Sequence, residues 1–62
     1  MSTGGRVINN MGFIGELEPG SSLTSNFGTV NVNRGGIIAN QGRIANNTLE
    51  GTVLSNVGTI NG

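Results

Sequence analysis

The sequence contains no cysteine and no histidine, so disulfide bonds and zinc sites built from these residues are excluded. Lysine, aspartate and tyrosine are also absent, which leaves three glutamates as the side chains that could serve acid–base catalysis. We therefore expect a protein that is not an enzyme, with no catalytic residues, no metal and no cofactor.

Charge and aromatic residues are equally scarce. The net charge is zero, and the two phenylalanines are the only aromatic residues, so neither a basic stripe nor a stacking platform for nucleic acid is expected. Apolar runs stay well below the roughly 18 residues that span a bilayer, and no signal-peptide pattern opens the chain. We therefore expect a protein that is made in the cytoplasm, is not exported by a cleaved signal and does not insert into a membrane.

The chain has only 62 residues, a size at which burying enough apolar surface is difficult. Small domains of this kind are usually stabilised by disulfides, a metal or association with further copies. Because the composition disfavours the first two, self-association is the remaining expectation.

A repeat runs through almost the whole sequence. An aliphatic residue recurs in steps of 7, 9, 7, 7, 7, 9 and 7 residues, and a glycine stands two positions before it in seven of the eight units. These aliphatic residues form the predicted core column: Val7, Ile14, Leu23, Val30, Ile37, Ile44, Val53 and Ile60. We predict eight short strands over residues 4–62 as one domain, preceded by a flexible segment 1–3.

The residues that precede each aliphatic position are typical of a turn at a corner between two strands. Asparagine tolerates tight bends, and glycine fits where backbones crowd together. The predicted corner residues are Asn10, Gly12, Asn26, Gly28, Asn33, Gly35, Asn40, Gly42, Gly51, Asn56 and Gly58.

Counting the units in threes gives Val7, Val30 and Val53 an equal spacing and therefore the same phase. This spacing predicts an all-β, three-sided β-solenoid with about 2.7 turns. A single chain of that length would leave its edge strands unpaired. We therefore predict an intertwined, triple-stranded β-helix homotrimer.

Three stretches of the repeat, Asn26–Val30, Asn40–Ile44 and Asn56–Ile60, resemble the glycine-punctuated repeats of β-helical shafts in bacteriophage tail spikes, tail fibres and needles. The resemblance implies a rigid structural component of a virion, with sister subunits and other virion or tail proteins as partners. The same units resemble, more weakly, the repeats of filamentous haemagglutinin-type adhesins. The alternative function is therefore a capsid-decorating or adhesin-type binding module.

Two aromatic side chains are candidates for contact with a partner. Phe13 lies between a glycine and a core residue and should point outward, where either the loop at 17–19 covers it or a partner binds it. Phe27 at a corner is either a plug or an exposed contact. Glu16 and Glu18 lie on one side of an extended segment, and we expect them to be solvated rather than to bind a cation.

Overall fold

The computed structural model describes residues 2–61 and consists of eight β-strands joined by short turns. Each strand except the last has five residues, with the predicted aliphatic residue at its second position, where a branched side chain suits extended backbone. The strands are β1 (Arg6–Asn10), β2 (Phe13–Leu17), β3 (Ser22–Asn26), β4 (Thr29–Asn33), β5 (Gly36–Asn40), β6 (Arg43–Asn47), β7 (Thr52–Asn56) and β8 (Thr59–Ile60).

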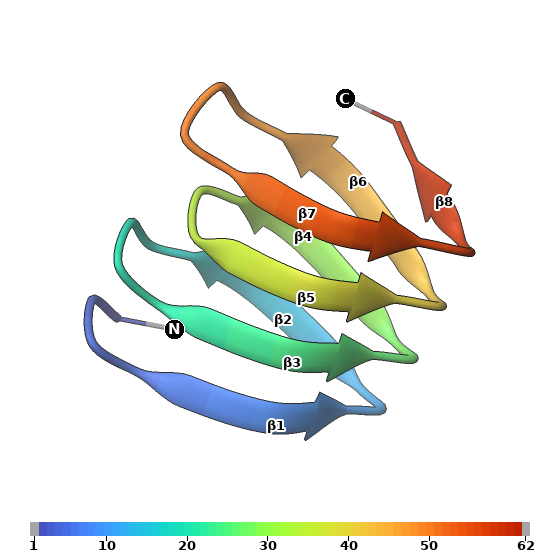
Figure 1. Cartoon of the computed structure of the whole chain (residues 1–62), viewed down its shortest axis with the longest axis horizontal. Helices are drawn as coiled ribbons and strands as arrows, with labels where there is room; N and C mark the ends of the chain where they lie inside the picture. The colour runs from blue at the N-terminus through green and yellow to red at the C-terminus, as the bar shows by residue number, and fades with distance from the viewer. Residues whose placement is uncertain (1, 62) are drawn as a thin grey trace.

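The chain winds as a β-solenoid in which alternate strands stack into two parallel sheets. One sheet has the order β1-β3-β5-β7 and the other β2-β4-β6-β8, as Figure 1 shows by the regular progression of colours along the stack. Each strand from β1 to β6 is therefore hydrogen-bonded to the strand two places further along the chain. The prediction of an all-β solenoid is confirmed.

The prediction of three sides is wrong, because two strands complete each coil. Val7 lies opposite Leu23, and Leu23 lies opposite Ile37, so each coil comprises two repeat units instead of three. The predicted alignment of Val7 with Val30 does not occur, since Val30 stacks on Ile14 in the other sheet. A short unit consists of one five-residue strand and one two-residue corner, and two units already return the chain to the same sheet.

The two corners of the coil differ in length. The turns from the first sheet to the second always have two residues, whereas the turns back have four, two and four residues. The added residues form a tight turn at 18–21, where the Ser21 N–H donates to the Glu18 carbonyl over 3.1 Å. Pro19 and the left-handed Gly20 (φ 87°) occupy the central positions that suit a type II turn.

The N-terminal segment forms a similar turn. The Gly5 N–H donates to the Ser2 carbonyl over 2.8 Å, and Gly4 has a φ of 82°. The Thr3 hydroxyl donates to the Pro19 carbonyl over 2.7 Å, which joins this turn to the next one along the axis. Of the segment 1–3 that was expected to be flexible, Met1 lies outside the described residues, and Ser2 and Thr3 belong to this turn.

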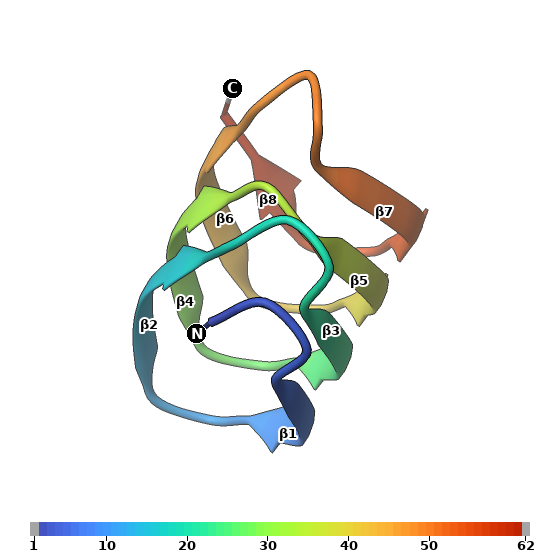
Figure 2. The same cartoon turned by 90° about the vertical axis from the view of Figure 1, so that its left-hand side faces the viewer.

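The two sheets face each other, as Figure 2 shows, and the core lies between them. Its fully buried members are Leu17, Leu23, Val30, Ile37 and Ile44. Val7, Ile14, Val53 and Ile60 pack against this cluster from the first and last coils and are only partly buried.

Consecutive coils of the same chain pair directly with each other, as in the β1–β3 and β2–β4 pairs. An intertwined trimer would place strands of sister chains between these coils. Because paired strands are already about 4.8 Å apart, no further strand fits between them. The coils of this chain therefore differ from the intertwined arrangement that the sequence suggested.

Candidate functional site

The glycines of the two-residue corners lie in one column along the coil axis. Gly12, Gly28, Gly42 and Gly58 follow each other in successive coils. A Cβ atom added at any of the last three would overlap the carbonyl oxygen of the glycine in the preceding coil. Glycine is therefore required at these positions by the closeness of the backbones rather than by an unusual φ.

Beside the glycines, four asparagines form a continuous hydrogen-bonded ladder. The Nδ2 of Asn10 donates to the Oδ1 of Asn26 over 2.8 Å, and Asn26 donates in the same way to Asn40. Asn40 then donates to Asn56 over 2.7 Å. The ladder runs in one direction, from the first coil to the last.

The ladder also joins the side chains to the corner backbone. The Nδ2 of Asn26 lies 3.2 Å from the carbonyl of Gly28, and Asn26 and Asn40 are fully buried. A buried amide is costly unless its hydrogen bonds are made, and among residues 2–61 no buried side-chain nitrogen or oxygen lacks a partner. Asn26 and Asn40 therefore depend on the coils on both sides of them.

The remaining predicted corner residues lie at the opposite corner. Asn33 donates to Asn47 over 2.8 Å, and its Oδ1 accepts from the Gly35 N–H. A Cβ added at Gly51 would overlap the Asn33 carbonyl. The predicted corner residues therefore form two columns, a continuous one and a short one.

Sequence reasoning missed two positions of the short column. Asn47 lies seven residues after Asn40 and continues the spacing of the repeat, but a glycine does not follow it two residues later. Leu17 lies seven residues after Asn10 and occupies an asparagine position, where it is fully buried in the core. The seven-residue spacing alone would have identified both.

The first and last coils present open ends that differ in their polar groups. Asn56 in the last coil is exposed, and its Nδ2 donates within its own corner to the Gly58 carbonyl over 3.2 Å. Asn10 in the first coil is 8% exposed, and its Oδ1 accepts from the Gly12 N–H over 3.2 Å. The last coil therefore presents the terminal donor of the ladder, and the first coil presents the terminal acceptor.

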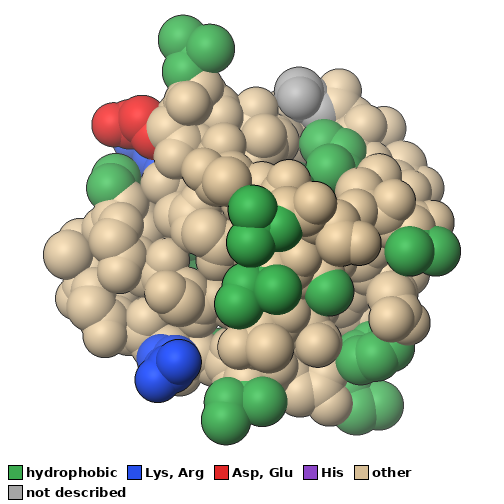
Figure 3. Space-filling model, viewed as in Figure 1, with side chains coloured by type: hydrophobic (Ala, Val, Ile, Leu, Met, Phe, Trp, Pro, Cys, Tyr) green, Lys and Arg blue, Asp and Glu red, His purple; other side chains and the backbone are tan. Residues whose placement is uncertain are grey.

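Apolar side chains also gather on the outer surface. Ile8, Ile38 and Leu54 lie one position after core residues of β1, β5 and β7 and are exposed, and Figure 3 shows hydrophobic side chains on this face. Phe13 is 70% exposed and Phe27 48% exposed, so the expected cover of Phe13 by the loop at 17–19 does not form. Leu17 is directed into the core instead.

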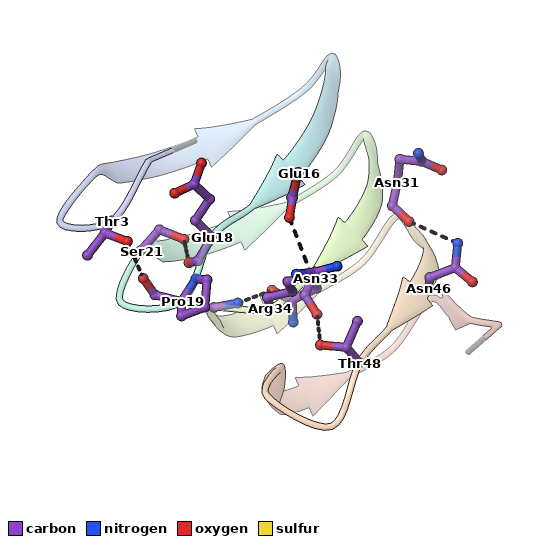
Figure 4. Close-up of polar contacts among 11 residues, drawn as sticks. Thr3, Glu16, Glu18, Pro19, Ser21, Asn31, Asn33, Arg34, Asn46 and Thr48 are labelled. Atoms are coloured by element: carbon purple, nitrogen blue, oxygen red, sulfur yellow. Dashed lines mark hydrogen bonds and ion pairs between the residues drawn. The ribbon is translucent and has the colours of Figure 1, made fainter.

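The charged groups make one ion pair among the described residues. The Nε of Arg34 lies 3.3 Å from the Oε2 of Glu16, with both side chains about half exposed. Figure 4 shows Glu16 directed toward Arg34, while Glu18 lies beside Ser21. Residues 2–61 contain no cluster of three metal-ligating side chains and no detectable pocket.

In the part of the chain that the structure describes, no helix could cross a membrane. A comparison of the chain with protein-family models, curated proteins and solved structures found no match.

Proposed function

We propose that this chain is a non-catalytic structural protein, a rigid segment of β-solenoid that forms part of a shaft, spike or plug. The observation that carries this proposal is the continuous ladder Asn10–Asn26–Asn40–Asn56, which links all four coils at one corner. The buried amides of Asn26 and Asn40 thus hold one coil to the next. Such a network resists sliding and bending because any displacement breaks several buried hydrogen bonds together.

The setting we propose is a phage or phage-like particle, on the resemblance of the repeats to phage shafts. In this proposal the chain is located in the virion and contacts other virion or tail proteins. We also propose a homotrimer, which both the edge strands left unpaired in a single chain and the resemblance favour. Three copies associated side by side are compatible with coils that close within each chain.

A first experiment tests rigidity in the purified chain. Amide hydrogen exchange should show the slowest exchange at Asn26, Val30 and Asn40, whose backbones lie in the central coils. The exposed residues Leu49 and Glu50 in the turn at 48–51 serve as the internal reference for fast exchange. Uniformly fast exchange across the central coils would show that the ladder does not make a rigid body, and the proposal would fail.

A second experiment tests the setting. Proteomic analysis of purified particles from the source should find the chain in a fixed ratio to the shaft or capsid subunits. A chain that is abundant in the cell and missing from the particles would contradict a role in the virion.

The alternative, a decorating or adhesin-type module, is favoured by the exposed Phe13 and by the outer column that includes Ile38 and Leu54. Exposed aromatic and aliphatic side chains are typical of interface anchors. A decorating module should bind purified capsids saturably, and Phe13→Ser should weaken that binding about tenfold or more. The matched control is Thr59→Ser. Thr59 is aligned with Phe13 in the register of the β2-β4-β6-β8 sheet and lies at the other end of that sheet.

A further inference from the structure

We propose that the two open ends of the solenoid bind each other, so that copies of this chain stack head to tail into a continuous coil. The inference rests on the proposed structural role and names its partner, which is a second copy of the chain. It is carried by the polarity of the hydrogen bonds and by the matching register of the first and last coils.

The asparagine ladder supplies the first part of the match. Asn26 and Asn40 accept at Oδ1 from the preceding coil and donate from Nδ2 to the next one. Asn56 has its donor directed to the nearby Gly58 carbonyl, and the acceptor of Asn10 is held by the Gly12 N–H. Asn26 donates both to the carbonyl of its own corner and to the next asparagine, so Asn56 can keep its bond to Gly58 and add a ladder bond to Asn10 of the next copy. In that copy the Oδ1 of Asn10 would accept from Asn56 in place of the Gly12 N–H.

The corner backbone supplies the second part. Between coils, the N–H groups of Phe27 and Gly28 donate to the Asn10 carbonyl, and the same bonds join Val57 and Gly58 to Asn40. In the first coil the equivalent donors are Met11 and Gly12, and in the last coil the equivalent acceptor is the Asn56 carbonyl. One end therefore offers peptide donors to the peptide acceptors of the other.

The core supplies the third part. Val7 and Ile14 cap one end of the apolar cluster, Val53 and Ile60 cap the other, and all four are only partly buried. A stacked copy would place Val7 on Val53 and Ile14 on Ile60, which continues the spacing within the chain. Contact between the two ends would bury the exposed parts of these four side chains and so remove apolar surface from water.

The same polarity disfavours a closed dimer of two like ends. At this corner, two first coils would bring peptide donors against peptide donors, and two last coils would bring acceptors against acceptors. A contact between unlike ends does not close on itself, so it generates an open stack. Each added copy contributes four coils, or about 19 Å of length at about 4.8 Å for each coil.

Gly12 provides a test that separates stacking from folding. A Cβ added at Gly12 meets no heavy atom within 4 Å, whereas a Cβ at Gly28 would overlap the carbonyl of the preceding coil. In a stack, Gly58 of the neighbouring copy would lie against Gly12 in the way that Gly12 lies against Gly28. Gly12→Ala should therefore leave a single chain folded and block the addition of a second copy.

The experiment is sedimentation velocity of the full chain over a wide concentration range, with circular dichroism to check the fold. Wild-type particles should grow in mass with concentration without a fixed limit. Gly12→Ala should weaken association by at least about a hundredfold while keeping the strand spectrum, since backbone overlap at a packed contact is costly. Asn56→Asp, which removes the donor and retains the acceptor for Asn40, should weaken it about tenfold.

The matched control is Asn31→Asp, an identical change of side chain and charge at an exposed position of β4 in the middle of the stack. It should assemble like the wild type. A folded wild-type chain that stays at 6.3 kDa, or that stops at three times that mass, would overturn stacking and leave the rigid structural role intact. An unfolded chain would instead contradict the structural role itself.

A tandem fusion gives a test that is independent of concentration. In a direct fusion, Val7 of the second copy follows Ile60 of the first by nine residues, the step that separates Ile14 from Leu23. The fusion should melt at a higher temperature than the single chain, and Gly12→Ala in its second copy should remove that gain. A fusion that melts like the single chain, with or without the substitution, would contradict the proposed contact.

Discussion

Both corners of the coil redirect the chain from one sheet to the other, but they do so with different turns and residues. At the first corner every turn has two residues, a glycine presses against the preceding coil, and the ladder from Asn10 to Asn56 is unbroken. At the second corner the turns vary in length, Leu17 takes the first position of the asparagine column, and a single ladder bond joins Asn33 to Asn47. The comparison teaches that the uniform corner sets the stacking of the coils, while the other corner accommodates changes in the length of the chain.

The largest expected effect comes from breaking the glycine column at the uniform corner. Gly28→Ala would force a methyl group into the Gly12 carbonyl, while the Thr29 N–H donates to that same carbonyl and holds the two corners together. We expect a loss of about 3 kcal/mol or more in the free energy of unfolding, the upper range for overpacking. Urea titration at low protein concentration measures it, and Gly12→Ala, which meets no neighbour, is the control that should remain close to wild type.

The next effect comes from the ladder. Asn26→Ala removes the acceptor of Asn10 and the donor to Asn40, so both neighbours lose their ladder partner in a buried setting. Each such group costs about 1–3 kcal/mol, so we expect a loss of about 2–4 kcal/mol in the free energy of unfolding.

Asn47→Ala makes the same change at the end of the short ladder, where the side chain is only partly buried. It should cost about 1 kcal/mol, the usual contribution of one hydrogen bond. Equal losses for Asn26→Ala and Asn47→Ala in thermal or urea unfolding would show that the continuous ladder has no special role.

An effect smaller than that of Asn26→Ala is expected in the turn at 18–21. Gly20 has a φ of 87°, where an L-residue is strained, and an added Cβ would lie 3.0 Å from the flexible Thr3 side chain. Gly20→Ala should lower the free energy of unfolding by about 1–2 kcal/mol, the cost of the left-handed conformation. Gly20→Asn should recover part of this loss, because asparagine tolerates that region. Identical melting temperatures for the two variants would argue against backbone strain as the cause.

The smallest effect is expected for the ion pair between β2 and the corner that follows β4. Arg34 and Glu16 are about half exposed, so solvent screens their attraction. Arg34→Ala should change the free energy of unfolding by about 0–1 kcal/mol, and salt at about 1 M should reduce the difference between variant and wild type. A loss that is large and independent of salt would indicate that the Arg34 side chain stabilises the turn by packing.

Much of the fold follows from the repeat, but the number of strands in each coil does not. The aliphatic spacing is compatible with a coil of three units, from Val7 to Val30, and with a coil of two units, from Val7 to Leu23. A clue was present in the two nine-residue steps, which end at Leu23 and Val53 and are separated by four units. Two units per coil place both insertions at the same corner, whereas three units place them on different sides.

The candidate site was predictable to a similar degree. The predicted asparagines and glycines are the residues that line the corners, because these residue types suit bends and close backbones in any coil. Their division into two columns was not predictable, since it depends on the same coil count. The exposure of Phe13 was also not predictable, because the loop expected to cover it turns Leu17 inward.

By itself the sequence determined that short strands alternate with asparagine and glycine corners, since each unit carries its own pattern of branched, polar and small residues. Only the tertiary structure decided which units stack on each other, and therefore which asparagines form the continuous ladder. The physical reason is that the bonds between coils join residues far apart in the chain, as Asn10 to Asn26 and Asn26 to Asn40, and their choice depends on how sharply each corner redirects the chain.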